Sequence, residues 1–371
     1  GTPALLFVEV PHMRLEQLRI SGLRCLADVS LVLDPALNVF TGANGAGKTS
    51  VLEAVFLLSH ARSFRSGARE ALQARGIPRL SIFAELRQSN DRLLRLGLGR
   101  EASRWEARLE GEGASLGDLI AECAVTCFEP GSHALIAGAA EERRRFLDWG
   151  VFHVEHAFLD NWRRYQRALK QRNSLLRAGL EPGSPLYAPW ETELANLADW
   201  IDNQRRDYLG RLRPVLHACV GNLLPELGEP GLRYRRGWIE DRPLHEQLET
   251  QRGRDLARGH TGLGAHRADW SLAFEQAPQR EHLSRGQEKL AALGCMLAQA
   301  RLYADQHGDW PIICLDDLAS ELDEAHQAAV ITQLVESGAQ VLVTGTNLPE
   351  PLRELPHRMF HVEQGCLTPL L

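Results

Sequence analysis

The chain has 371 residues, of which 44% are hydrophobic and 24% are charged, as in an ordinary globular protein with room for roughly two domains. It contains no run of about 18 apolar residues, which excludes a membrane-spanning helix, and we expect no membrane partner. The formal net charge of −6 argues against an affinity for nucleic acid that covers the whole surface.

The start of the chain and its cysteines favour a cytoplasmic protein. Residues 1–12 lack the basic beginning of a signal peptide, and a strand-like stretch opens at Met13. We therefore predict that residues 1–12 are an upstream extension or tag. The seven cysteines are odd in number and scattered, and the spacing of Cys123 and Cys127 is not that of a usual zinc site, so reduced thiols are the simplest account.

The first part of the chain reads as strands around a glycine-rich loop. Residues 13–40 hold strand-like apolar runs, and a helical pattern follows the loop to about His60. Residues 80–86 and 93–98 are further short strands between turns rich in glycine. These elements predict an α/β arrangement for the N-terminal part.

From about Phe146 the pattern changes to helix. Residues 162–176 and 190–224 carry apolar positions at roughly helical spacing, with a turn at residues 179–185 between them, which predicts an inserted helical hairpin. An α/β pattern returns near residue 262. Its predicted elements are strands at 311–315 and 340–344, a helix at 324–337 and a hairpin around 364–365.

Residues 42–49 match the phosphate-loop pattern G-x-x-x-x-G-K-[ST] between an apolar strand and a helix. Glycines let backbone N–H groups surround phosphates at the helix start, where the helix dipole also favours anions. We predict that Lys48 contacts the β- and γ-phosphates and acts in catalysis, and that the Thr49 hydroxyl is a ligand of Mg²⁺. A glycine-rich turn before an ordinary helix is the alternative. The predicted ATP-binding residues are Gly42, Ala43, Asn44, Gly45, Ala46, Gly47, Lys48, Thr49 and Ser50.

Lysine is rare in this chain. Only three of the 42 basic residues are lysines, namely Lys48, Lys170 and Lys289, and the others are arginines. A compact ammonium suits a phosphate loop where a planar guanidinium would not, so the lysine at position 48 supports the phosphate site. A GC-rich genome would explain the arginines but not the positions at which lysine remains.

A second helix start lies at residues 283–289, which read Leu-Ser-Arg-Gly-Gln-Glu-Lys. Ser284 and the glutamine three positions later, Gln287, have the pattern of a capping box, S-x-x-Q, which predicts a helix N-terminus. The stretch also fits the Leu-Ser-x-Gly-Gln signature of dimeric ATPases, in which the signature of one subunit closes on the nucleotide held by the other. The two interpretations are compatible. The residues predicted to act in trans are Ser284, Arg285, Gly286 and Gln287.

An apolar run at residues 312–315 ends in two acids, as a Walker B strand does. We predict that Asp316 holds Mg²⁺ and that Asp317 orients or deprotonates the attacking water. An acidic turn that caps the next helix is the alternative. In a dimer closed by ATP, nucleotide binding stabilises the association by mass action, and hydrolysis weakens it.

Positive charge is concentrated in one segment. Residues 143–177 carry nine basic residues and three acidic ones, which is typical of a phosphate-binding surface on an acidic chain. Arg163, Arg167 and Lys170 share one helix face at i, i+4 and i+7, and we predict that they follow a DNA backbone without reading bases. A solvated helix face is the alternative.

Other candidate contacts are tied less closely to a motif. Trp162 and Tyr165 could stack on bases, although core packing is the simpler expectation. Arg62 and Arg65 follow the phosphate-loop helix, and Arg24 follows the first strand, so each could contact nucleotide phosphates.

These stretches together resemble the RecF family of DNA replication and repair proteins. The stretch 144–150, Arg-Arg-Phe-Leu-Asp-Trp-Gly, and the stretch 170–173, Lys-Gln-Arg-Asn, are specific, because transporter ATPases have no reason to carry them. The resemblance covers nearly everything from Met13 onward. It also rests on the phosphate loop and on residues 62–65, 283–289 and 316–323.

The resemblance implies an α/β fold, a P-loop ATPase head of the ABC/SMC type with two lobes and an inserted helical second domain. The implied domains are the N-terminal part of the head at residues 13–145, the helical arm at 146–261, and the C-terminal part at 262–371 with signature and Walker B. The implied activity is a weak, DNA-stimulated ATPase that uses ATP and Mg²⁺.

The resemblance also implies partners and a cellular role. The implied partners are double-stranded and gapped DNA, junctions with single strands, a second copy of the chain in an ATP-dependent homodimer, and the RecO and RecR proteins. Through these, RecA recombinase would be loaded onto single strands coated by SSB. The role would be recombinational repair, replication restart and the SOS response to DNA damage.

Two features depart from the pattern of transporter ATPases. Residues 344–347 read Thr-Gly-Thr-Asn where such proteins carry a switch histidine, so none is assigned. Residues 128–131, where a Gln-loop would lie, hold no glutamine, so that assignment stays open.

Two other functions compete with this interpretation. The nucleotide-binding subunit of a transporter predicts a coupling-helix partner, a shorter distance between loop and signature, and a switch histidine. A pure binding module with a structural phosphate loop is the third interpretation. The pair Asp316 and Asp317 argues against the module, because two acids at a strand end make sense chiefly for metal-assisted hydrolysis.

Overall fold

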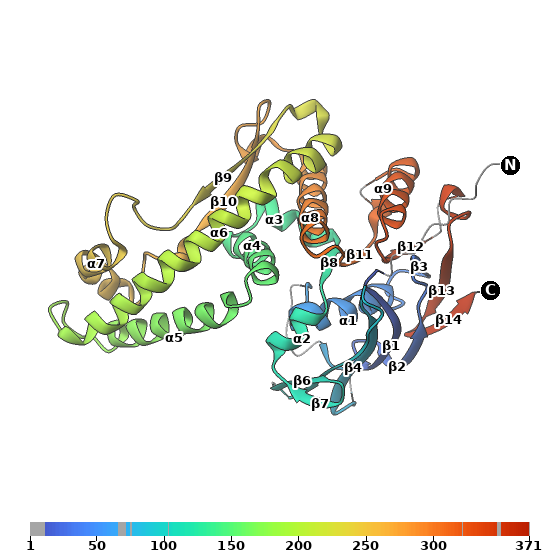
Figure 1. Cartoon of the computed structure of the whole chain (residues 1–371), viewed down its shortest axis with the longest axis horizontal. Coiled ribbons are helices and arrows are strands. Elements are labelled where there is room, and N and C mark those ends of the chain that lie inside the picture. Colours follow the sequence, from blue (N-terminus) through green and yellow to red (C-terminus); the bar gives the residue numbers. More distant parts are fainter. Residues whose placement is uncertain are drawn as a thin grey trace. The chain divides into compact units, whose positions relative to one another are not determined.

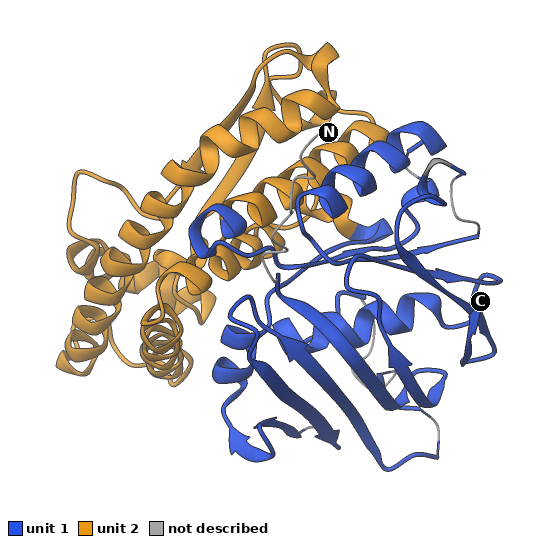
Figure 2. Ribbon diagram, turned by 45° about the vertical axis from the view of Figure 1, so that its right-hand side comes forward, with its two compact units in different colours: residues 1–131, 303–371 blue, residues 132–302 orange. Residues whose placement is uncertain are grey.

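The computed structural model describes residues 12–65, 72–74, 76–102, 104–320, 322–346 and 350–370. The chain divides into two compact units (Figure 2). Unit 1 joins Gly1–Gly131 to Tyr303–Leu371, and unit 2 is Ser132–Leu302. The predicted arm, residues 146–261, falls inside unit 2. Of the predicted extension, residues 1–12, only His12 lies within the described part.

Unit 1 is built around a six-stranded sheet (Figure 1). Its strands are, in spatial order, β14 (Cys366–Leu370), β13 (His357–Glu363), β3 (Leu37–Thr41), β12 (Val341–Gly345), β11 (Ile312–Leu315) and β8 (Val125–Phe128). Strand β14 is antiparallel to β13, and the other neighbours run parallel. Strands β3, β8 and β11 are buried at every position, as in parallel sheets that are covered on both faces.

A second sheet of unit 1 is antiparallel throughout. In spatial order it contains β2 (Leu26–Val32), β1 (Arg14–Leu23), β4 (Arg79–Arg87), β5 (Leu93–Glu101), β6 (Arg104–Leu109) and β7 (Glu112–Ala114). Along β4, buried residues alternate with more exposed ones, so this strand turns one face to the core.

The helices of unit 1 include the one predicted after the glycine-rich loop. The predicted helix to about His60 is confirmed, as are the strands at 80–86, 93–98, 311–315 and 340–344. The predicted helix at 324–337 is also confirmed, and the Asp323 carboxylate accepts a hydrogen bond from the His326 N–H at its start. These helices are α1 (Lys48–His60), α2 (Leu116–Glu122) and α9 (Glu324–Glu336).

Unit 2 is mainly helical, and α5 runs alongside α6 in Figure 1 as the predicted helical hairpin. Its helices are α3 (Ala134–Ala137), α4 (Ala140–Val154), α5 (Phe158–Arg177), α6 (Ala188–Leu223), α7 (Leu244–Arg258) and the part of α8 (Arg285–His307) up to Leu302. A two-stranded antiparallel sheet, β9 (Pro230–Arg235) and β10 (Asp269–Phe274), accompanies them. The first of these strands lies within the arm that was predicted as helical.

Short 3-10 turns connect several elements. They are η2 (Pro130–His133), η3 (Pro185–Tyr187), η4 (Pro225–Leu227), η5 (Ala265–Arg267), η6 (Arg280–His282), η7 (Leu318–Ser320) and η8 (Glu350–Leu352). Across the described residues, we find no helix with both the length and the apolar character needed to span a lipid bilayer.

The stretch 144–150 joins α4 to the rest of unit 2. Asp148 accepts hydrogen bonds from Nε and Nη2 of the buried Arg205 at 2.8 and 2.9 Å. Phe146 packs on Trp270, with 5.4 Å between the ring centroids. The middle of this stretch therefore serves packing between α4, α6 and β10.

The two aromatic candidates on α5 belong to the interior. Tyr165 is 1% exposed, and Trp162 packs against the same apolar cluster while Arg205 lies over its ring at 5.4 Å. The expectation of core packing is confirmed for both residues, because neighbouring side chains occupy the ring faces on which a base would stack.

Candidate nucleotide site

The glycine-rich loop has the backbone that the phosphate-loop pattern predicts. Gly42, Gly45 and Gly47 have φ angles of 144°, 81° and 116°, in the region that side chains disfavour. A Cβ at Gly42 would lie 2.2 Å from the carbonyl oxygen of Val362 in β13, so only glycine fits there. Gly47 is the N-cap of α1 and provides no side-chain cap, so the first N–H groups of the helix face the loop.

The ammonium of Lys48 is held by the loop itself. Its Nζ donates hydrogen bonds to the carbonyl oxygens of Gly42 and Ala43, the second at 3.0 Å. The loop is in turn supported by the terminal hairpin, because the Gly365 N–H donates to the Ala46 oxygen at 2.9 Å. This arrangement places a positive charge where an anion would sit against the helix N-terminus.

Two hydroxyls and one carboxylate meet at the carboxyl ends of the central strands. The Thr49 Oγ1 donates to Asp316 Oδ1 at 2.9 Å, and the Thr344 Oγ1 donates to the same oxygen at 2.7 Å. Asp316 is 4% exposed. Burial raises the pKa of this carboxyl, against the two hydroxyl hydrogen bonds and the charge of Arg65, which lower it.

This donor set fits Mg²⁺ together with phosphates. A hydroxyl and a carboxylate are hard oxygen ligands, and Mg²⁺ in nucleotide sites takes its remaining ligands from water and phosphates. Among the described residues, no group of three or more His, Cys, Asp or Glu side chains could hold a metal ion by itself. The predicted pair, Thr49 and Asp316, is thus brought together.

The two consecutive acids point to different surroundings. Asp317 is exposed and has a φ of 51°, which turns the chain sharply after the buried Asp316. Its N–H donates to the Thr344 Oγ1 at 2.9 Å. Thr344 therefore contacts the side chain of Asp316 and the backbone of Asp317, although in the sequence it stands out only as the place where a switch histidine is missing. Its position at the end of β12, beside β11, is the signal that could have identified it.

Two of the three arginines near the loop, Arg24 and Arg65, lie beside a buried acid. Glu53 of α1 is fully buried and accepts hydrogen bonds from Nε and Nη2 of Arg24 at 3.1 and 2.8 Å and from the Ser63 hydroxyl. Arg65 lies 3.8 Å from the same carboxylate, and Arg62 lies over the Phe56 ring at 5.8 Å. Their contact with nucleotide phosphates stays a prediction.

The predicted signature lies at the start of α8, in unit 2. The capping box is confirmed, because the Ser284 hydroxyl accepts from the Gln287 N–H at 3.2 Å and the Gln287 Oε1 accepts from the Ser284 N–H at 3.0 Å. Ser284, Arg285 and Gly286 are exposed. Their action on a nucleotide held by a second copy stays a prediction.

The predicted DNA-contacting stripe is an exposed face of α5. Arg163, Arg167 and Lys170 are all exposed, and Arg163 lies 3.3 Å from Asp160 of the same helix. The shared face is confirmed, and the contact with DNA stays a prediction.

Parts of two predicted motifs lie outside the described residues. These are Glu321, within the stretch 316–323, and Asn347, within 344–347. In the region considered for a Gln-loop, the Glu129 carboxylate accepts from the Gly131 N–H at 2.6 Å, and the assignment stays open.

Comparison with known proteins decides the family. The family model described as RecF/RecN/SMC N terminal domain matches residues 14–365. A Stenotrophomonas maltophilia protein named DNA replication and repair protein RecF is 47% identical over 363 residues, covering 96% of this chain and 99% of that protein. The chain belongs to the RecF family. A Pseudomonas putida RecF is 40% identical, covering 96% of this chain and 98% of its own length.

Solved structures agree with this membership at the level of the fold. A structure of the recombination mediator protein RecF with ATP, in the RecFOR pathway, matches with a TM-score of 0.86 at 23% identity, covering 97% of this chain and 98% of that chain. An Smc head domain from Pyrococcus furiosus matches with a TM-score of 0.54 at 14% identity, covering 96% of each chain. The chain therefore has the predicted α/β fold, a P-loop ATPase head of the ABC/SMC type with an inserted helical second domain.

Proposed function

We propose that this member of the RecF family is an ATP-dependent DNA-binding protein of recombinational repair and replication restart. The observation that carries the proposal is the convergence of the Thr49 and Thr344 hydroxyls on one oxygen of Asp316, at 2.9 and 2.7 Å, beside a phosphate loop that holds Lys48. The curated relatives of the same length carry the name of a DNA replication and repair protein, which supports the process.

Each residue of the site has a distinct part in this proposal. Lys48 exchanges its carbonyl partners for β- and γ-phosphate oxygens, and residues 42–47 with Ser50 surround the phosphates through backbone N–H groups. Thr49 and Asp316 would hold Mg²⁺, which would neutralise charge on the phosphates. Asp317, exposed beside Asp316, orients the attacking water and accepts its proton.

The proposed cycle depends on two copies of the chain. Ser284, Arg285, Gly286 and Gln287 of one copy close on the nucleotide of the other, so that ATP binding favours a head-to-head dimer. Slow hydrolysis then opens it. The ATP-bound RecF structure is described in the RecFOR pathway, which supports RecO and RecR as partners and, through them, RecA loading on SSB-coated strands.

The test is ATP hydrolysis measured with and without duplex, gapped and single-stranded DNA over a range of protein concentrations. We expect stimulation by DNA and a rate that rises more than linearly with protein. A rate that ignores DNA and is linear in protein would leave a nucleotide site but contradict the DNA-coupled dimer. A transporter subunit would likewise hydrolyse ATP at a rate that ignores DNA.

A further inference from the structure

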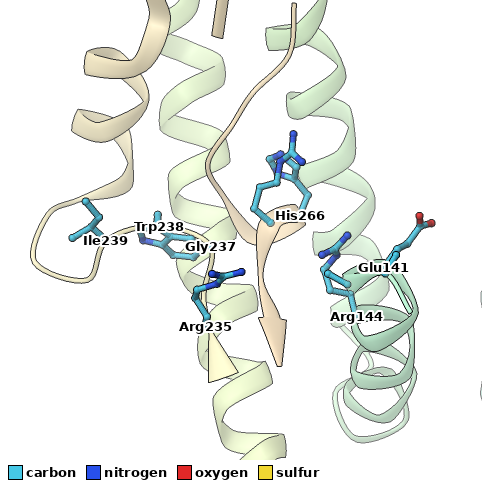
Figure 3. Close-up of a pocket in the computed structure, with 10 residues that line it drawn as sticks. Glu141, Arg144, Arg235, Gly237, Trp238, Ile239 and His266 are labelled. Atoms are coloured by element: carbon cyan, nitrogen blue, oxygen red, sulfur yellow. The ribbon is translucent and has the colours of Figure 1, made fainter. Parts of the chain in front are cut away.

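A basic pocket lies within unit 2, apart from the residues assigned above to nucleotide or DNA. It has a volume of about 710 Å³ (Figure 3). Three arginines from three different elements line it, Arg144 of α4, Arg235 at the end of β9 and Arg267 of η5. In Figure 3, Arg144 and Arg235 reach toward the pocket from different sides.

These three arginines differ from their neighbours in the chain, which pair with acids. Among the described residues, no carboxylate lies within 4.0 Å of the three guanidinium groups. The adjacent Arg143 pairs with Asp269 at 2.7 Å, and Arg236 pairs with Asp199 at 2.8 Å. In each adjacent pair, the arginine that faces the pocket is thus the one without an acid beside it in the described part of the chain.

Neutral backbone acceptors hold two of the three guanidinium groups in place without neutralising them. Arg144 donates to the Ala268 carbonyl at 2.8 Å, and Arg267 donates to the Thr261 carbonyl at 3.3 Å. Burial and the nearby charge of Arg205 lower the pKa of Arg144, against the charges of Asp269, Asp148 and Glu141, which raise it.

The N-terminus of α4 adds to the positive field. Ala139, the N-cap, and the first two helical residues line the pocket, and the cap has no side-chain hydrogen bond. The 15-residue helix therefore directs its N-terminal dipole charge toward the pocket. Of the described residues in the lining, Glu141 is the single acid, and it pairs with Arg145.

Close packing of the chain forms the wall of the pocket without a ligand. Gly237 has a φ of 97°, and a Cβ there would lie 2.4 Å from the Gly264 carbonyl oxygen, so two backbones meet closely. The Trp238 ring is buried under the Arg236 guanidinium at 4.0 Å. Ile239 is 63% exposed at the rim, where an apolar partner could cover it.

We propose that this pocket binds a phosphodiester group of a nucleic-acid strand. Guanidinium groups that approach one space from three elements match a phosphate, which offers acceptor oxygens in several directions, better than a planar carboxylate. The exposed Ile239 would cover the adjoining sugar. The inference rests on the proposed function, because it adds a second DNA contact to the stripe on α5.

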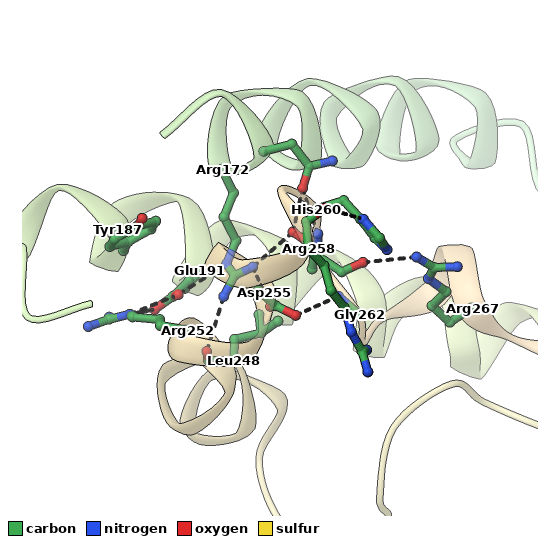
Figure 4. A network of polar contacts seen from close by, with 12 residues as sticks. Arg172, Tyr187, Glu191, Leu248, Arg252, Asp255, Arg258, His260, Gly262 and Arg267 are labelled. Atoms are coloured by element: carbon green, nitrogen blue, oxygen red, sulfur yellow. Dashed lines mark hydrogen bonds and ion pairs between the residues drawn. The ribbon is translucent and has the colours of Figure 1, made fainter. Parts of the chain in front are cut away.

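A structural role does not account for these arginines. Elsewhere in unit 2, buried arginines form a closed network with acids (Figure 4). There Arg172 donates to Glu191 at 3.0 Å and to Asp255 at 2.8 Å, and Arg252 donates to Glu191 at 2.6 Å. In this network every guanidinium group has an acid beside it, whereas around the three pocket arginines the described residues provide none within reach of an ion pair.

The test compares DNA affinity over a range of salt concentrations for wild type, Arg235→Ala and Arg267→Ala. Within the described part of the chain the Arg235 side chain makes no hydrogen bond, so its variant keeps the fold, which a thermal melt and ATP binding check. Arg254→Ala is the control, because this α7 arginine is exposed and does not line the pocket. We expect each pocket variant to bind DNA several-fold more weakly, with a salt slope lower by up to about 0.9 on duplex or 0.7 on single strands, the value for one phosphate that is no longer neutralised.

The outcomes separate this inference from the proposed function. If wild type with ATP does not bind DNA, the proposed function fails. If wild type binds DNA and both pocket variants match Arg254→Ala in affinity and slope, the pocket inference fails alone. Fluorescent polyglutamate is tested in parallel, and variants that lose it while keeping DNA affinity would identify an acidic protein as the ligand and overturn the nucleic-acid assignment.

Discussion

Unit 2 uses arginine in two opposite ways. In the network of Arg172, Arg252, Glu191 and Asp255, each residue is at most 7% exposed, and both guanidinium groups lie near the Tyr187 ring. In the pocket, Arg235 and Arg267 are exposed, and no acid of the described chain pairs with them. The comparison shows that arginine content alone does not reveal a role, because the same side chain pairs with buried acids in the network and has no acid beside it in the described lining of the pocket.

The largest effect is expected when an acid is removed from the buried network. Asp255→Ala would leave Arg172 buried with one acid fewer, which costs about 3–5 kcal/mol of unfolding free energy. Chemical denaturation measures it, with Arg254→Ala as the neighbouring control. Asp255→Asn keeps a hydrogen-bond acceptor and should lose less. A decrease below about 1 kcal/mol, of the size expected at the surface, would show that the network is dispensable.

The pocket wall contains a histidine that should make stability depend on pH. Burial lowers the pKa of His266 to about 4 from 6.5. Its Nδ1 lies 2.7 Å from the Tyr165 hydroxyl and its Nε2 lies 3.1 Å from the Thr261 oxygen, which suits the neutral ring. The unfolded chain gains this proton below about pH 6.5 and the folded chain only near pH 4, so stability falls as the pH drops between these values.

The expected size of that fall is up to about 3 kcal/mol between pH 7 and pH 4. Urea denaturation of wild type and His266→Gln at several pH values isolates it, because the other titrating groups are shared. Wild type should lose more stability than the variant. Parallel curves for the two proteins would mean that His266 takes up its proton equally in both states.

The Lys48 ammonium of the phosphate loop can be compared with the buried arginines of the network and the arginines of the pocket. Lys48→Arg keeps the charge but replaces a compact ammonium by a planar fork, so we expect an unchanged thermal melt and a decrease of about 100-fold in ATP turnover. Lys170→Arg, on the exposed face of α5, is the matched control, with turnover of both variants measured in the absence of DNA because Lys170 belongs to the predicted DNA-contacting stripe. Turnover near that of wild type in Lys48→Arg would refute the site.

The smallest effect concerns the exposed stripe on α5. Reversing charge at Arg163 and Arg167 should weaken binding to duplex DNA and lower the salt slope by about 0.9 for each phosphate that the variant no longer neutralises. Arg254→Glu with Arg258→Glu is the matched pair, because these two exposed arginines are also four residues apart on a helix. Equal weakening in both pairs would indicate a general effect of charge rather than a specific interaction.

Local patterns predicted much of the nucleotide site. The loop, the start of α1 and the acids after β11 are encoded within a few residues, so their structure follows from the sequence. The partners of these residues are not local. Asp316 meets Thr49 across 267 positions and Thr344 across 28, and no single-sequence pattern links a threonine at one strand end to an acid at another.

The three consecutive arginines at 143–145 show the same limit at the pocket. Arg143 pairs with Asp269, Arg145 pairs with the acids of its own helix, and Arg144 faces the pocket. No local pattern separates the three, since Asp269 lies 126 positions away from Arg143. Strand β9 was missed for a related reason, because its partner β10 follows only after α7 and the intervening residues.

The support of the phosphate loop by the terminal hairpin has a consequence for synthesis. Gly42 packs against Val362, and Ala46 accepts a hydrogen bond from Gly365, so the loop reaches its final form only with β13 and β14 in place. A ribosome makes the loop first and the hairpin more than 300 residues later, at about 5–20 residues per second. For at least about 15 seconds the nascent chain therefore lacks the final form of the phosphate loop that would bind nucleotide.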